Sequence, residues 1–90
     1  MDRDLSEVEG ACLVVSQFTL AGSLRKGRRP SFDGAEDPER ATMLYERVCA
    51  ELRGFGVPVQ SGRFGARMEV DLVNDGPVTL LVCTRDGALL

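Results

Sequence analysis

The sequence contains no histidine, and its three cysteines lie far apart, with no CxxC pair among them. Lack of histidine excludes Ser-His-Asp and Cys-His nucleophile arrangements built within one chain, and it removes the usual zinc sites. We therefore expect neither a metal nor a cofactor. Any chemistry must use backbone groups, hydroxyls, charged side chains or the substrate itself.

Long apolar runs are also missing, and no stretch approaches the ~20 residues that span a bilayer. Residues 1–9 are charged and acidic, unlike a secretory signal or an arginine-rich transit peptide. At 43% hydrophobic and 28% charged residues, the composition is that of a globular rather than a disordered chain. The sequence thus predicts a single cytoplasmic domain over residues 1–90 with no membrane partner.

The cysteines are Cys12, Cys49 and Cys83. Two of them fall in apolar, strand-like runs and Cys49 falls within a helical pattern. Free cysteine is among the most often buried residue types. All three are therefore predicted to be buried as small hydrophobic residues.

Positive charge is concentrated in one place, although the net charge is −3. Four of the five residues from 25 to 29 are basic: Arg25, Lys26, Arg28 and Arg29. A concentrated basic patch on an acidic body indicates local contact with phosphates. The alternative is a solvated loop that happens to be basic.

A helix is the clearest element in the sequence. Asp37 suits the N-cap, Pro38 the first helical position and Glu39 the positive end of the helix dipole. Gly54, Gly56 and Pro58 mark its end. Its predicted apolar face, at three- and four-residue spacing, consists of Ala41, Leu44, Tyr45, Val48, Leu52 and Phe55.

Extended segments flank this helix. The apolar, β-branched run at 11–20 predicts a buried strand, and residues 21–37 a long loop. A short extended piece at 57–60, an alternating strand at 68–72, a turn at 74–77 and an apolar strand at 78–83 follow, before a loose tail. The order predicts an α+β domain, with one long helix packed on a mostly antiparallel sheet.

Two short motifs each permit a plain structural interpretation. In SQFTL at 16–20, Phe18 and Leu20 would point into the core, and a threonine without a base is usually only a hydrogen-bonding residue. In NDGPVT at 74–79, Gly76 and Pro77 would form a hairpin turn.

Taken together, the motifs are more specific. SQFTL at 16–20, RKGRRPSF at 25–32, a helix, GRFGARM at 62–68 and NDGPVT at 74–79 occur in the order typical of D-aminoacyl-tRNA deacylases. The chain resembles this family from about residue 12 to residue 82. The resemblance implies hydrolysis of the ester that links a D-amino acid, or glycine mischarged on alanine tRNA, to tRNA. It therefore implies chiral proofreading in translation.

The resemblance also implies roles for the first motif. Ser16, Gln17, Phe18 and Thr19 match catalytic-pocket residues, and the amides around Phe18 and Thr19 would stabilise developing negative charge. The nucleophile would be a tRNA 2′-hydroxyl, a water or the Thr19 hydroxyl. We favour the first two because nothing in the chain is suited to accept the proton of Thr19.

Family members pair as homodimers, and the resemblance implies the same here. The Gly76-Pro77 peptide would be cis, with its carbonyls projecting into the pocket of the other subunit. Rigid acceptors there would engage the substrate ammonium, leave no room for an L side chain and let glycine through. Phe64 and Met68 would wall the substrate pocket, although either could belong to the core, and the basic loop would hold the 3′-terminal phosphates of tRNA.

The family domain normally begins with strands and a helix that residues 1–10 do not resemble. We therefore expect an incomplete domain in which the strand at 11–20 has lost neighbours and exposes an apolar edge. The alternative functions are an inactive, truncated relative that binds tRNA or a partner chain, and a small structural domain that pairs through that edge.

Overall fold

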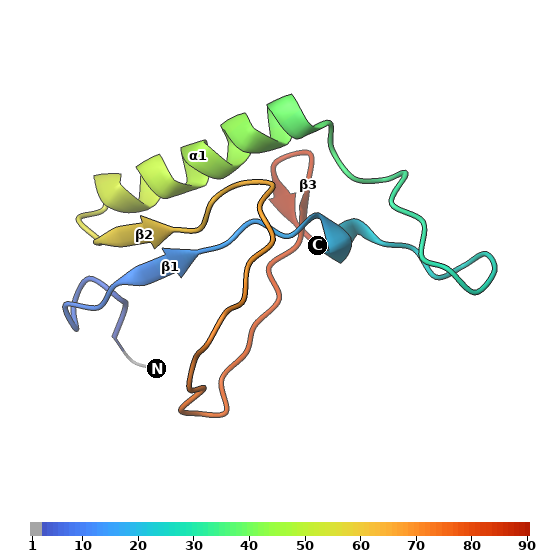
Figure 1. Cartoon of the computed structure of the whole chain (residues 1–90). Helices are drawn as coiled ribbons and strands as arrows, with labels where there is room; N and C mark the ends of the chain where they lie inside the picture. Colours follow the sequence, from blue (N-terminus) through green and yellow to red (C-terminus); the bar gives the residue numbers. More distant parts are fainter. Residues whose placement is uncertain (1–2) are drawn as a thin grey trace.

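A computed structural model describes residues 3–90. The elements in chain order are β1 (Cys12–Val14), the 3-10 helix η1 (Phe18–Ala21), α1 (Pro38–Gly54), β2 (Val59–Ser61), β3 (Thr84–Arg85) and β4 (Ala88–Leu89). Figure 1 shows α1 lying along β1 and β2, with the chain then leaving this body as a long extended arm, residues 67–83, before it reaches β3. Within residues 3–90, no helix combines the length and apolarity needed to cross a membrane.

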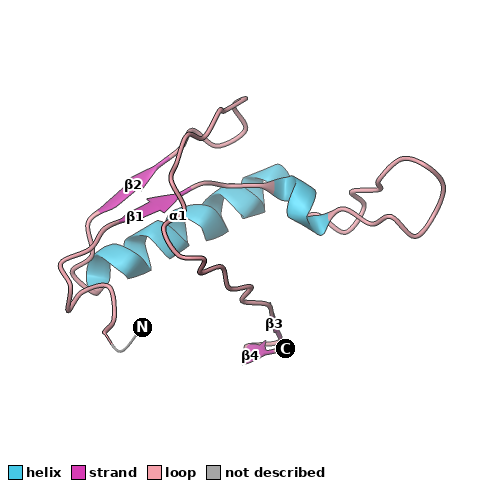
Figure 2. Ribbon diagram, turned by 90° about the horizontal axis from the view of Figure 1, so that it is seen from below, coloured by secondary structure: helices cyan, strands magenta, loops and turns pink. Residues whose placement is uncertain are grey.

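The two small sheets differ in direction. β1 and β2 pair in parallel, with Cys12 opposite Val59 and Val14 opposite Ser61, whereas β3 and β4 form an antiparallel hairpin (Figure 2). The predicted α+β class is confirmed, but the prediction of a mostly antiparallel sheet is wrong. The reason is the connection from β1 through α1 to β2, because a helical crossover brings the chain back in the same direction.

Strand lengths also differ from prediction. The predicted strand at 11–20 is reduced to Cys12–Val14, because its described partner, β2, ends at Ser61. The segments 68–72 and 78–83 run extended along the arm (Figure 1), but within residues 3–90 neither forms a ladder and residues 69–83 are exposed. The tail, predicted to be loose, forms β3 and β4 around Asp86 and Gly87, whose φ values are 52° and 79°.

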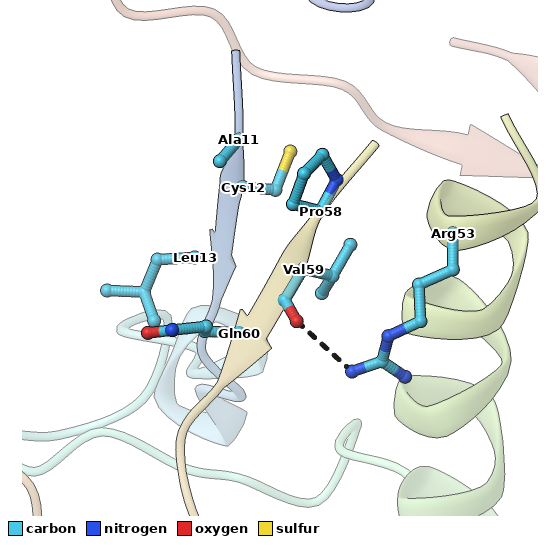
Figure 3. A pocket seen from close by; sticks show the side chains of 7 residues that line it. All are labelled: Ala11, Cys12, Leu13, Arg53, Pro58, Val59 and Gln60. Carbon is cyan, nitrogen blue, oxygen red and sulfur yellow. Dashed lines mark hydrogen bonds between the residues drawn. The ribbon is translucent and has the colours of Figure 1, made fainter. Parts of the chain in front are cut away.

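A side chain of α1 also contacts β2. The Arg53 Nη2 donates a hydrogen bond of 3.3 Å to the Val59 carbonyl oxygen, as Figure 3 shows. Arg53 thereby ties the last turn of α1 to β2. The same side chain borders a shallow hollow of about 720 Å³. The other lining residues are Ala11, Cys12, Leu13, Pro58, Val59 and Gln60.

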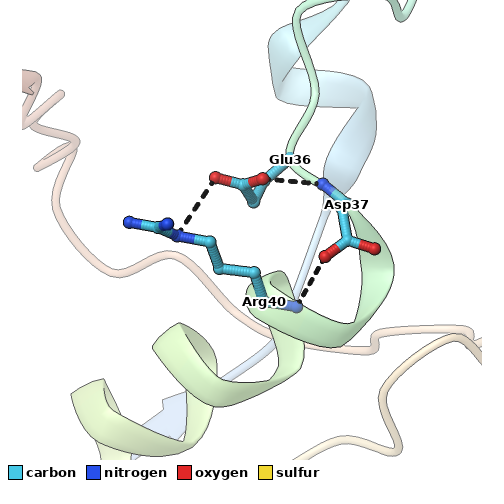
Figure 4. Close-up of polar contacts among 3 residues, drawn as sticks. All are labelled: Glu36, Asp37 and Arg40. Atoms are coloured by element: carbon cyan, nitrogen blue, oxygen red, sulfur yellow. Dashed lines mark hydrogen bonds and ion pairs between the residues drawn. The ribbon is translucent and has the colours of Figure 1, made fainter.

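The start of α1 is formed as predicted. The Asp37 carboxylate accepts a hydrogen bond of 3.1 Å from the Arg40 amide, and Pro38 is the first helical residue (Figure 4). Glu36 accepts from the Asp37 amide at 2.9 Å and pairs with the exposed Arg40 side chain at 3.4 Å. These contacts satisfy backbone donors that the helix itself leaves free.

The core is small. Among the described residues, Cys49 and Val57 are the buried apolar side chains, at 4% and 6% exposure. On α1 the half-buried stripe follows Ala41, Tyr45 and Leu52. Leu44, Val48 and Phe55, predicted to pack against a sheet, are 50%, 50% and 74% exposed. Two short strands cover only a narrow stripe of the helix, which explains why this part of the prediction is wrong.

The cysteines divide in the same way. Cys49 is buried, as predicted. Cys12 is half-buried and Cys83 is exposed, so the prediction of burial is wrong for Cys83 and only partly met by Cys12. Cys83 directly precedes β3, in a stretch whose residues are all exposed.

The end of α1 offers a direct test of helix stability. Gly54 is the last helical residue, and a Cβ built there meets nothing within 4 Å. We expect Gly54→Ala to raise the free energy of unfolding by ~0.5–1 kcal/mol, because alanine loses less backbone entropy on folding. Gly56→Ala is the matched control: Gly56 has φ of +82°, so this change should lower stability by ~1–2 kcal/mol. Urea denaturation measures both, and equal shifts would contradict the assignment of the helix end.

Candidate functional site

The SQFTL motif lies where β1 gives way to η1. The strand ends at Val14, Ser16 is half-buried, and the chain is exposed from Gln17 onward. Gln17 is the N-cap of η1, with extended backbone angles of φ −152° and ψ 97°, and its side chain caps nothing. Phe18 and Leu20 are 64% and 83% exposed, so the plain interpretation that put them in the core is wrong.

Two backbone donors stand at the start of η1. In a 3-10 helix each amide donates to the carbonyl three residues earlier, so the first amides of the helix have no carbonyl within it to donate to. Here that first bond runs from the Leu20 amide to the Gln17 carbonyl, at 3.4 Å. Within residues 3–90 the Phe18 and Thr19 amides donate no hydrogen bond. Two adjacent N–H groups are thus left available to an external acceptor.

An aromatic contact joins this turn to the basic loop. The rings of Phe18 and Phe32 meet edge to face, with centroids 5.1 Å apart and planes at 66°. Gly22 lies beneath this pair: a Cβ there would come within 2.9 Å of Phe32 Cε1. Phe32 directly follows the loop, so the contact holds the base of the loop against η1.

The basic loop is closed by backbone bonds. Ser23 and Ser31 exchange two hydrogen bonds, of 2.7 and 2.8 Å, and Gly27 near the tip has φ of +70°. All four basic side chains are on exposed residues. The ion pairs found within residues 3–90, Arg40–Glu36 and Arg47–Glu51, involve none of them. The loop therefore presents its positive charge to solvent beside η1.

Two predicted pocket residues, Phe64 and Met68, follow the end of β2. Met68 is half-buried and lines a hollow of about 390 Å³ together with Leu13, Val15 and Gly62. A Cβ on Gly62 would come within 2.5 Å of the Met68 sulfur, so glycine permits this close approach. Phe64 is half-buried against Tyr45, with ring centroids 5.9 Å apart. Phe64 thus packs on the helix, while Met68 contributes to a surface hollow beside Val15.

The Gly76-Pro77 turn lies apart from these residues. Its peptide bond is cis, as the resemblance implies. A Cβ on Gly76 would collide with the Val78 backbone nitrogen, which accounts for glycine at this position. The turn forms the tip of the arm, at the end remote from α1 and away from η1 (Figure 1). Within one chain, therefore, it does not meet the SQFTL motif.

Tyr45 contacts the end of β1, and the sequence did not predict this contact. Its pattern assigned it to the apolar helix face, yet its hydroxyl donates to the Val14 carbonyl at 2.8 Å. A tyrosine within an apolar helical stripe was the available signal, since a buried hydroxyl usually finds a partner.

The chemistry open to this arrangement is narrow. No group of three His, Cys, Asp or Glu side chains comes together as a metal site within residues 3–90. Within residues 3–90 the Thr19 hydroxyl makes no hydrogen bond to a titratable side chain. Within residues 3–90 the site offers the unbonded amides of Phe18 and Thr19, the hollow that Met68 lines, and the adjacent basic loop.

Known proteins match the sequence closely. The family model for D-Tyr-tRNA(Tyr) deacylase matches residues 1–83. A D-aminoacyl-tRNA deacylase of Heliobacterium modesticaldum is 58% identical over 87 residues, which are 97% of this chain and 58% of that protein. Those of Symbiobacterium thermophilum and Paracoccus denitrificans are 56% and 53% identical, over 91% and 98% of this chain and 54% and 59% of theirs.

The chain thus spans a little more than half the length of these relatives. The matched residues nevertheless include every motif discussed above. On this basis the chain belongs to the D-Tyr-tRNA(Tyr) deacylase family.

Proposed function

We propose that this chain hydrolyses the ester bond of D-aminoacyl-tRNA and acts as a homodimer in the cytoplasm. The observation that carries the proposal is the placement of the SQFTL motif in a chain of this family. The motif follows β1 and carries two amides that have no partner within residues 3–90, and the Phe18–Phe32 contact holds the basic loop beside it. An ester carbonyl and the phosphates next to it on tRNA could engage both features together.

In this proposal the Phe18 and Thr19 amides face the carbonyl oxygen of the ester. They stabilise the negative charge that develops when the carbonyl is attacked, which is the task of an oxyanion hole. The attacking group is a water or the tRNA 2′-hydroxyl. Thr19 is assigned no nucleophilic role, because its hydroxyl makes no hydrogen bond to a base within residues 3–90. Ser16 and Gln17 flank the ester, Met68 lines the neighbouring hollow beside Val15, and Phe64 supports this wall through its contact with Tyr45.

Discrimination between enantiomers is assigned to a second copy of the chain. The Gly76-Pro77 turn stands at the tip of an exposed arm, remote from the SQFTL motif of its own chain (Figure 1). Such a tip is suited to enter the pocket of a partner. There its backbone carbonyls would accept hydrogen bonds from the substrate ammonium and occupy the space of an L side chain. Glycine, which has no side chain, would be hydrolysed as well, including glycine mischarged on alanine tRNA.

The proposal is tested with the purified 90-residue chain and four substrates: one tRNA charged with a D-amino acid, the same tRNA charged with its L counterpart, and alanine tRNA charged with glycine or with L-alanine. We expect loss of the D ester and of the glycine ester, while both L esters persist. Equal loss of all four would contradict discrimination by the Gly76-Pro77 turn. No loss of any ester, from a folded sample, would contradict turnover and leave a member of the family that binds without hydrolysing.

A further inference from the structure

One side chain of α1 reaches the ends of both strands that lead to the site. The Tyr45 hydroxyl oxygen lies 2.8 Å from the Val14 carbonyl oxygen and 3.4 Å from the Gly62 carbonyl oxygen. The hydroxyl has a single proton, so the shorter distance identifies Val14 as the main acceptor. Within residues 3–90 this is the side-chain hydrogen bond that joins α1 to β1.

The two strand ends meet at the same point. The Gly62 amide also donates to the Val14 carbonyl oxygen, at 3.1 Å, so this oxygen accepts from both Tyr45 and Gly62. Val14 lies two residues before Ser16, and Gly62 begins the GRFGARM segment. The Tyr45 ring in addition packs against Phe64. Both site segments therefore leave the body of the protein from atoms that Tyr45 contacts.

We propose that Tyr45 is a positioning residue for the deacylation site, a role that rests on the proposed function. Its hydroxyl fixes the peptide at the end of β1 and so sets the direction in which residues 16–19 enter the site. The Phe18 and Thr19 amides must point at one small volume to stabilise a developing oxyanion. A small rotation of the peptide after Val14 would turn both amides away together.

The alternative is that Tyr45 serves only to pack the helix. Tyr45→Phe separates the two roles, because phenylalanine keeps the ring and its contact with Phe64 and removes only the hydroxyl. The Val14 oxygen keeps its bond from Gly62, so the β1–β2 pairing survives. Thr42→Val is the matched control: it removes another hydroxyl of α1, whose bond of 2.7 Å goes to Pro38 within the same helix.

The first readout is amide hydrogen exchange followed by NMR on the whole chain. In Tyr45→Phe we expect the hydrogen-bonded amides of Leu20 and Gly62, which donate to the Gln17 and Val14 carbonyl oxygens, to exchange about five to ten times faster, the effect of losing one hydrogen bond on local opening. Amides in the middle of α1 should change less than about twofold. Thr42→Val should leave Leu20 and Gly62 unchanged. Uniform acceleration throughout the chain, or no change at Leu20 and Gly62, would overturn the proposal.

The second readout is turnover of a D-aminoacyl-tRNA, normalised to the folded fraction. We expect kcat to fall about tenfold in Tyr45→Phe, because misdirected amides lose transition-state stabilisation, while KM for tRNA stays within about twofold. A raised KM with unchanged kcat would overturn the proposal. If the unsubstituted chain has no turnover, the proposed function fails, and the exchange pattern alone then decides whether Tyr45 positions residues 16–19.

Discussion

Phe18→Pro is expected to slow deacylation by ~10²–10³-fold relative to Phe18→Ala. The two variants differ in one catalytic respect, because proline has no backbone N–H. Removing one donor of an oxyanion hole typically costs that factor in kcat. Both variants lose the ring that contacts Phe32, so any effect of that contact on the basic loop is common to them.

The backbone around residue 18 is suited to this substitution. Phe18 is the first residue of η1, a position where proline is favoured because its amide has no partner within the helix. Proline requires an extended conformation of the residue before it, and Gln17 already has φ −152° and ψ 97°. We therefore expect the fold to survive, which circular dichroism and the urea midpoint check.

The measurement is single-turnover hydrolysis of a D-aminoacyl-tRNA at saturating enzyme. Thr19→Ala is assayed beside the pair, because it keeps the amide and removes the hydroxyl; its rate should stay within about threefold. Equal rates for Phe18→Pro and Phe18→Ala would mean that the Phe18 amide does not face the reacting carbonyl. Loss of turnover in Thr19→Ala, with binding intact, would instead identify the hydroxyl as the nucleophile.

The helix could be predicted from the sequence because its signals are local. Asp37, Pro38 and Gly56 act on the backbone within a turn of their own positions, and each does so in the structure. The strands could not, because an extended segment becomes a strand only when a ladder partner lies beside it. The apolar residues at 78–83 suit a strand, but within residues 3–90 their backbone hydrogen bonding is limited to the Cys83 carbonyl, which accepts from the Leu90 amide at 2.8 Å.

The tail shows a signal that the sequence did contain. Asp86-Gly87 is a dipeptide typical of two-residue hairpin turns, which need positive φ at both central positions. Both residues have it, and β3 and β4 form on either side. The flanking strands are only two residues long, too short to show the alternation that marks a strand in a sequence.

The site was predictable to the extent that it is contiguous in sequence. The SQFTL motif and the basic loop lie within twenty residues of each other, and the Phe18–Phe32 contact holds them together. Tyr45 was not predictable as a neighbour of Val14, because their contact depends on how α1 crosses β1. The position of Gly76-Pro77 at the tip of an arm likewise follows from tertiary structure (Figure 1).

Neutralising the basic loop is expected to weaken tRNA binding strongly. Replacing Arg25, Lys26, Arg28 and Arg29 with glutamine should weaken tRNA binding by about 10²-fold at low salt, and reduce the slope of log Kd against log salt by about 3. A phosphate contact that is lost no longer releases its counterions on binding, and this removes roughly 0.7–0.9 from that slope. Stability should change little, because Ser23 and Ser31 close the loop through backbone bonds that the substitutions leave intact.

Two matched double variants distinguish the effect of the basic loop on tRNA binding from the effect of overall charge. Arg28→Gln/Arg29→Gln and Arg40→Gln/Arg47→Gln change the net charge equally, but Arg40 and Arg47 are paired with glutamates along the helix region. The loop pair should lower the salt slope by about 1.5, and the helix pair by less than about 0.5. Binding is measured from 50 to 200 mM salt with uncharged tRNA, so that the result does not depend on turnover. Equal slopes for the two pairs would show that tRNA responds to the overall charge of the protein, and the basic loop would lose its assigned role.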